Sequence, residues 1–219
     1  MCSVATPSHC AAIYGSGGQD DINFTTDGTC PTRWSPTHAN ISVIDNGNAR
    51  IEAIARRANA ADRWRPDDIK LLLVAQTPPL APDRYFYFDD VATHDGLFRY
   101  VSKGVLGQTP PREGKRAALS APRDRGVFLL DLKPDPFDAR PLNSFVESLI
   151  DRCRQTDPNA IVLIKSDVYD AAYTPLSAAG LPVVDIRIPF PGSGQQRRFE
   201  CAFAKALDAV DSMSSHQIA

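Results

Sequence analysis

The sequence lacks the features that mark several classes of protein. Its five cysteines are an odd number and form no C-x-x-C pair, which argues against a disulfide framework, a zinc knuckle and an iron–sulfur site. No stretch approaches the roughly 20 apolar residues that a membrane span needs, so we expect no membrane contact. Neither G-x-G-x-x-G nor G-x-x-x-x-G-K occurs. We therefore expect no cofactor and no metal.

An excess of charge of one sign is also missing. The net charge is −2, so any contact with nucleic acid has to come from a local patch. Lysine is scarce, with 6 residues against 18 arginines. Arginine binds phosphate bidentately, but a GC-rich genome produces the same bias, and we favour that explanation. Residues 1–6 show neither a basic start nor an apolar run, so we expect no secretory signal and a cytoplasmic protein.

The composition changes near residue 46. Residues 1–46 are rich in Ser, Thr, Gly, Asn and Pro without a sustained period, which predicts a loosely ordered arm. Residues 47–219 predict one domain, which we expect to be monomeric. This domain opens with an amphipathic helix over 49–65, in which Arg56 and Arg57 lie off the apolar face.

Four short apolar runs predict strands that are buried on both faces. Helical patterns lie between and after these runs, which indicates right-handed crossovers. The fold class we expect is therefore α/β, with three layers (α/β/α) and a central four-stranded parallel sheet. Ligands of such sheets bind at the carboxyl ends of the strands. The runs are 69–75, 126–130, 160–164 and 181–186, and the helical patterns are 96–106, 141–155, 168–179 and 193–210.

The segments that follow three of these strands resemble, in order, the motifs of the uracil-DNA glycosylase superfamily, over residues 69–207. Residues 75–79 (A-Q-T-P-P) are similar to the G-Q-D-P-Y motif, and Phe86 lies near the position of a phenylalanine that stacks on the base. Residues 126–131 (G-V-F-L-L-D) are similar to G-V-L-L-L-N, and residues 188–193 (I-P-F-P-G-S) are similar to H-P-S-P-L-S.

This resemblance implies a monofunctional DNA glycosylase that flips a pyrimidine out of DNA and hydrolyses its glycosidic bond. No lysine stands at a motif position of the first or last segment, so no Schiff-base step is expected, with Lys133 the one lysine nearby. The candidate residues are Gln76, Thr77 and Asp83 for catalysis; Phe86, Asp131, Pro79 and Ile188 for the base; and Pro191, Ser193, Gln195, Gln196, Arg197 and Arg198 for DNA.

Two departures from the family pattern weaken catalysis. Thr77 stands where the family has a water-activating aspartate, and Ile188 stands where it has a histidine that stabilises the departing base. Asp83, Asp89 and Asp90 are candidate replacement bases, and the sequence does not choose among them.

Asp131 replaces the asparagine that holds the base edge. An ionised carboxylate only accepts hydrogen bonds, which suits the amino group of cytosine, whereas a protonated one serves either base. Pro79 replaces a tyrosine that crowds carbon 5, which leaves room for a substituent such as those in some bacteriophage genomes and suits a role in phage defence. The alternative for Asp131 is a cap of the turn into Pro134.

Three other functions stay open at this point. One is a uracil-DNA glycosylase of base-excision repair, and a second is a module that binds a modified base without cleaving it. A third is a small-molecule enzyme on a doubly wound sheet. Residues 85–88 also fit an ordinary packed edge, and Arg197 and Arg198 fit the solvated face of a capped helix.

Overall fold

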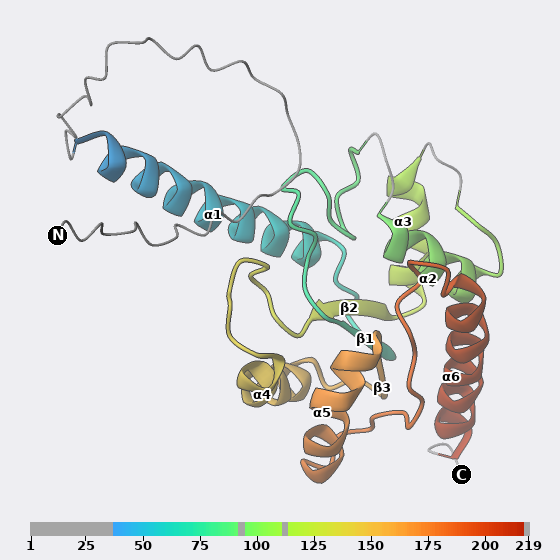
Figure 1. Ribbon diagram of the computed structural model, residues 1–219. Helices are drawn as coiled ribbons and strands as arrows, with labels where there is room; N and C mark the ends of the chain where they lie inside the picture. Colours follow the sequence, from blue (N-terminus) through green and yellow to red (C-terminus); the bar gives the residue numbers. More distant parts are fainter. Residues whose placement is uncertain (1–36, 92–94, 111–113, 217–219) are drawn as a thin grey trace, which may run out of the picture.

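The computed structural model describes residues 37–91, 95–110 and 114–216. Its centre is a parallel sheet in the order β2-β1-β3 (Figure 1). Every residue of β1 and β3 is buried, as expected for apolar runs that are covered on both faces. The register pairs Ala75 with Asp131 and Val74 with Leu163. The strands are β1 (Leu71–Ala75), β2 (Val127–Asp131) and β3 (Ala160–Leu163).

The fourth predicted strand, 181–186, is not a strand in the structure. This segment follows β3 through two isolated parallel bridges, at Val183 and Ile188. The amides of Val183 and Ile186 donate to carbonyls two residues earlier, at 2.8 and 3.0 Å, so they take no part in a ladder. The described sheet therefore has three strands, and the predicted four-stranded sheet is wrong in this respect.

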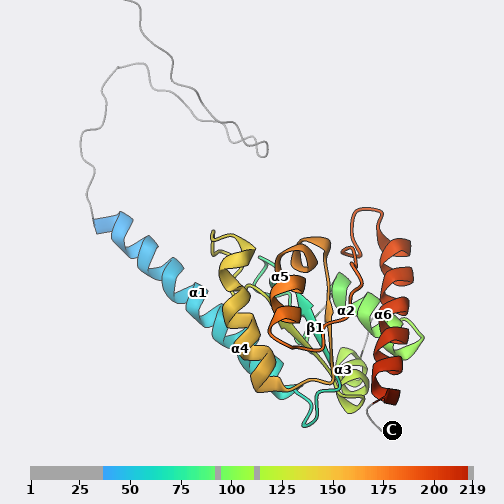
Figure 2. The ribbon, with the colours of Figure 1, turned by 90° about the horizontal axis from the view of Figure 1, so that it is seen from below.

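Helices cover both faces of the sheet. One face carries α2, α3 and α6, and the other carries α4 and α5 with the inner end of α1 (Figures 1 and 2). The predicted helix over 96–106 coincides with α2, whereas α3, which contains Pro122, was missed. The helices are α1 (Thr37–Arg63), α2 (Gly96–Leu106), α3 (Lys115–Asp124), α4 (Val146–Thr156), α5 (Ser166–Ala178) and α6 (Gln196–His216), with a 3₁₀ turn at Leu142–Phe145 before α4.

Helix α1 crosses the predicted boundary between the arm and the domain. It begins at Thr37, within the segment 1–46 that was expected to be loosely ordered, and residues 1–36 lie outside the described residues. The residues from 37 to 48 include three asparagines and Gly47, which have low helix propensity, so the pattern hid the start of the helix. The outer part of α1 projects from the body of the molecule, and its inner end lies against the sheet (Figure 2).

Candidate functional site

The order of the strands places a topological switch point between β1 and β3. The chain passes from β1 to β2 on one side and then crosses back to β3 on the other, so the connections after β1 and β3 diverge. Ligands of open α/β sheets bind outside the carboxyl ends of the strands at such a point. Two hollows open along this edge: one around Asp131 at the end of β2, and one around Lys165 just after β3.

The first hollow, the Asp131 pocket, has a volume of about 290 Å³ and lies between α1, the end of β2 and α4. Its walls are mainly apolar, with a few polar groups that converge on the cavity, which is the usual composition of a small-molecule site. The polar residues of the lining are Arg57, Asp62, Arg65, Tyr85, Asp131, Arg152, Gln155 and Thr156.

Asp131 is the buried acid of this pocket. It is 8% exposed, and burial raises the pKa of its carboxyl to about 7, with Asp95 adding to the rise while Arg152 and Arg57 oppose it. No hydrogen bond within the described part of the chain reaches the carboxylate, and only the backbone carbonyl of Asp131 is engaged. Near neutral pH the carboxyl is present in both forms, so it can accept or donate a hydrogen bond.

The two arginines nearest to Asp131 do not pair with it. Arg152 donates to the backbone carbonyls of Asp131 and Leu132, at 2.8 and 2.9 Å, and so holds the end of β2 in place. Arg57 is 4% exposed and donates through Nη2 to the carbonyl of Pro79 at 2.8 Å, while its Nε has no partner. Arg57 was predicted to lie off the apolar face of its helix, and its burial corrects this.

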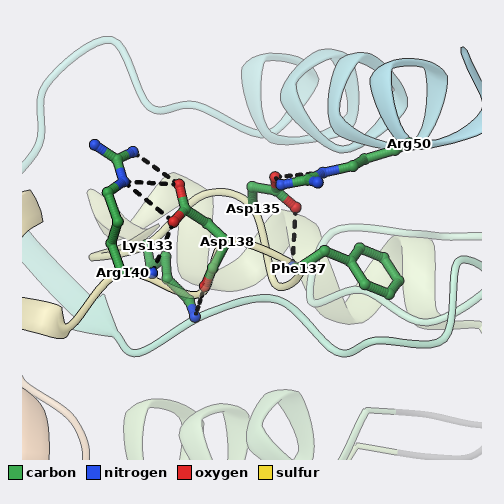
Figure 3. Close-up of polar contacts among 6 residues, drawn as sticks. All are labelled: Arg50, Lys133, Asp135, Phe137, Asp138 and Arg140. Carbon is green, nitrogen blue, oxygen red and sulfur yellow. Dashed lines mark hydrogen bonds and ion pairs between the residues drawn. The ribbon is translucent and has the colours of Figure 1, made fainter. Parts of the chain in front are cut away.

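The segment after β2 joins the pocket to α1. The guanidinium of Arg50 binds the carboxylate of Asp135, while Arg140 binds Asp138 and the Lys133 Nζ donates to the Asp138 carbonyl at 2.7 Å (Figure 3). These contacts occupy Lys133 within its own loop. They also hold α1 beside the end of β2, so the pocket is preformed.

Phe86 does not face the Asp131 pocket, contrary to the predicted stacking role. Its ring is 5% exposed and lies edge-to-face against Phe98, with centroids 5.4 Å apart. The neighbouring Tyr85 lines the pocket instead, and burial followed by the charge of Asp131 raises the pKa of its phenol far above the usual range. The buried Lys115 donates to the Tyr85 carbonyl at 2.9 Å and fixes this segment. Residues 85–88 are all aromatic, so the sequence does not indicate which of the four rings lines the pocket.

The other predicted base and catalytic residues are scattered. Ile188 is fully buried and bridges Ile164, so its side chain cannot touch a ligand. Thr77 is half-buried, with an Oγ1 that is buried and has no partner, and Asp83 is exposed and does not line the pocket. Pro78 lines the pocket rather than Pro79, whose carbonyl holds Arg57.

Of the other carboxylates considered as replacement bases, neither lines the Asp131 pocket. Asp89 binds Arg116 at 2.9 Å, and Asp90 is exposed on the far side of α1.

The second hollow, the Lys165 basin, is an open depression of about 700 Å³ between the start of α5 and the segment before α6. Three of the predicted DNA contacts line it: Ser193, Gln195 and Arg198. Pro191 is buried, while the half-buried Gln196 and the exposed Arg197 lie outside it.

Two cations of the basin, the half-buried Lys165 and the exposed Arg187, are paired with exposed carboxylates. Arg187 binds Asp170 at 2.6 Å, and Lys165 binds Asp167 at 2.9 Å while its Nζ also contacts the Gln76 Oε1. Exposed ion pairs contribute little, so an anion can displace them. Lys165 has φ of 85°, in the left-handed region that is strained for a residue with a Cβ. Lys165 is not among the site residues predicted from the sequence; its place just after the buried strand β3 is the signal that could have found it.

Two further properties complete the description. No three His, Cys, Asp or Glu side chains in residues 37–91, 95–110 and 114–216 gather as a metal site. No described helix is long and apolar enough to cross a membrane. The resemblance to uracil-DNA glycosylases stays a hypothesis that rests on the three motifs. No protein-family model matches the sequence, and no curated protein matches it.

Proposed function

We propose that the protein is a monofunctional DNA glycosylase that draws a cytosine-type base out of DNA into the Asp131 pocket. The observation that carries the proposal is the buried carboxyl of Asp131 at the end of β2, which lines the cavity and has no hydrogen-bond partner among residues 37–91, 95–110 and 114–216. A buried polar group without a partner costs several kcal/mol, so such a group is typical of a site whose partner is a ligand.

The chemistry of the carboxyl favours an aminopyrimidine. In its neutral form it accepts from the N4 amino group of cytosine and donates to N3, which makes two parallel hydrogen bonds. In its ionised form it still accepts from N4, whereas it repels the O4 oxygen of uracil. The preference for cytosine over uracil is therefore expected above the pKa of about 7, where the carboxyl is ionised, because the neutral form can also pair with uracil.

Asp131 also supplies the acid that the reaction needs. Its proton passes to N3 of the base, the bond between C1′ and N1 breaks with its electron pair on the base, and a water adds to C1′ and loses a proton to solvent. Positioned general acids contribute roughly 10²–10⁴-fold to rates, most effectively when their pKa lies near the working pH. This route needs neither an aspartate at position 77 nor a histidine at position 188.

The Lys165 basin would hold the DNA backbone beside the flipped nucleotide. The strands β2 and β3 flank β1, so their ends are about 10 Å apart at a spacing of roughly 4.8 Å per strand. Lys165, Arg187 and Arg198 present positive charge there, and arginine forks suit phosphate. Lys133, the lysine considered for a Schiff base, is bound to Asp138 within its loop, which favours the monofunctional reaction.

One observation favours a second candidate, a protein that reads a modified base without cleaving it. The Thr77 hydroxyl is buried, and the exposed Asp83 does not line the pocket, so neither of these two predicted residues is in place to activate water. The two candidates share the pocket and differ only in the chemical step.

The test uses oligonucleotides that carry uracil, cytosine, 5-hydroxymethylcytosine or glucosylated 5-hydroxymethylcytosine. Incubation followed by alkali should break the strand at the cytosine-type base, and the Asp131→Asn variant should lose most of this activity. Retention of the oligonucleotide without strand breaks would favour the reader. Absence of both would refute the two candidates together.

A further inference from the structure

Helix α1 contributes to the Asp131 pocket although it lies outside residues 69–207, where the motifs occur. Arg50 ties it to the segment after β2, and Arg57 ties it to the segment after β1 through the carbonyls of Pro79 and Ala81. Arg57 lines the pocket together with four other residues of α1: Ile54, Ala58, Ala61 and Asp62. The helix is thus one wall of the site.

Arg57 is the buried cation of this wall, and its hydrogen bonds are incomplete. Only Nη2 is engaged, by two neutral carbonyls at 2.8 and 3.4 Å, while Nε is buried without a partner. Within the described residues no carboxylate lies within 4.0 Å of the guanidinium. Buried charges are normally paired, and an unpaired one carries a desolvation cost. The pocket therefore holds a cation and an acid that face the same cavity without touching.

We infer that Arg57 binds the acceptor side of the base, at O2, and stabilises the partial negative charge that develops there as the glycosidic bond breaks and until the proton of Asp131 has reached N3. This inference rests on the proposed glycosylase function. The electron pair of the C1′–N1 bond moves onto N1 and is shared with O2, and a guanidinium beside O2 stabilises that charge while keeping its own protons. A donor in a water-excluded site acts far more strongly than in water.

The arrangement also explains why Ile188 can be apolar. The charge that stabilises the leaving base enters from α1, on the opposite side of the sheet's edge from the segment that contains Ile188. Asp131 reads the amino side of the ring and Arg57 reads the carbonyl side. A ligand with a donor at one edge and an acceptor at the other bridges the two buried groups, which are not paired with each other.

The experiment compares Arg57→Gln with Arg56→Gln, a matched control at the adjacent exposed position, whose guanidinium lies over Phe88 outside the pocket. Single-turnover rates are measured on oligonucleotides that carry cytosine or 5-fluorocytosine. The electron-withdrawing fluorine stabilises the departing base, so it replaces part of what Arg57 supplies. We expect Arg57→Gln to slow cleavage of cytosine by about 10²–10³-fold, to slow 5-fluorocytosine clearly less, and Arg56→Gln to leave both rates unchanged.

Equal slowing of both substrates by Arg57→Gln would overturn the inference, because a structural role does not depend on the leaving group. If Arg57→Gln fails to fold, Arg57→Lys, which keeps the charge but removes the Nε donor, is measured in the same way. If the wild type cleaves none of the substrates, the proposed function fails separately. Titration of free cytosine then decides the base contact, and equal affinity of the wild type and the Arg57 variant refutes it.

Discussion

The Asp131 pocket contains two buried ionisable side chains, Arg57 and Asp131, although Asp62 and Arg65 of its lining are exposed. In the Lys165 basin, Lys165 is half-buried and Arg187 and Arg198 are exposed. Arg57 and Asp131 are 4% and 8% exposed, and they face a cavity of about 290 Å³. The side chains of Lys165 and Arg187 are 32% and 54% exposed, and each binds a carboxylate that is itself more than half exposed. Both hollows lie on the same edge of the same sheet.

This difference in side-chain exposure predicts different functions for the two hollows. The low dielectric of the pocket strengthens the hydrogen bonds of its buried polar groups and raises the cost of leaving them unmade. The pocket is therefore suited to selecting a base and protonating it. Exposed charges are screened by salt, so the basin is suited to holding a phosphate backbone with little selectivity. The following variants are chosen to break or sharpen this contrast.

The largest effect on the free energy of unfolding should come from Phe86, the buried ring next to Tyr85. Phe86→Ala removes a buried aromatic side chain that packs against Phe98, and we expect it to lower the free energy of unfolding by about 3–5 kcal/mol. The matched change in the basin is Phe190→Ala, at a ring that is 46% exposed, with an expected effect within about 0.5 kcal/mol. Chemical denaturation of both variants measures the difference. Normal stability of Phe86→Ala with weakened base binding would restore Phe86 to a stacking role.

The acid of the pocket should make stability depend on pH. The pKa of Asp131 is raised in the folded state to about 7, so its contribution to stability is complete below about 4 and is lost as pH rises through 7. The wild type should lose roughly 2–4 kcal/mol across this range relative to Asp131→Asn, which cannot ionise. Urea titrations of both proteins from pH 4 to pH 8 test this. Parallel curves would mean that the carboxyl ionises freely.

The same residue should set the preference between bases. Asp131→Asn replaces a carboxyl by an amide that can serve uracil as well as cytosine, so relative activity should shift toward uracil by about 1–3 kcal/mol. In the wild type, discrimination against uracil should increase as pH rises through 7, because the ionised form repels O4. Single-turnover rates on paired cytosine and uracil oligonucleotides provide the measurement. An unchanged ratio in the variant would make Asp131 a structural cap.

The smallest effect should come from the basin, and it concerns the salt dependence of DNA binding. Arg198→Ala should reduce the slope of log affinity for duplex DNA against log salt by about 0.9 for one lost phosphate contact. Arg197→Ala, one residue away and outside the basin, is the control and should leave the slope unchanged. Filter binding at several salt concentrations distinguishes the two. Equal slopes for both variants would place the DNA backbone elsewhere.

Much of the sheet could be predicted from the sequence. The runs at 69–75, 126–130 and 160–164 are confirmed as β1, β2 and β3, because a continuous apolar run of that length is satisfied only when both faces are covered. The run at 181–186 has the same composition, but Pro182 precedes its apolar core, and the amides of Val183 and Ile186 bond locally while that of Val184 bonds to Ile161 of β3. The composition of a run does not predict which carbonyls accept hydrogen bonds from its backbone amides.

For the site, the sequence determined the position of Asp131, since a polar residue that ends a buried strand must lie at the carboxyl edge of the sheet. The tertiary structure alone decided which groups share that edge. Arg57 reaches the pocket from a helix more than 70 residues earlier in the chain, and Lys165 meets Gln76 across 89 residues. The tertiary structure also determined that Tyr85, and not Phe86, lines the pocket. Side-chain burial depends on what packs from elsewhere in the chain, and the local pattern of a sequence does not contain that information.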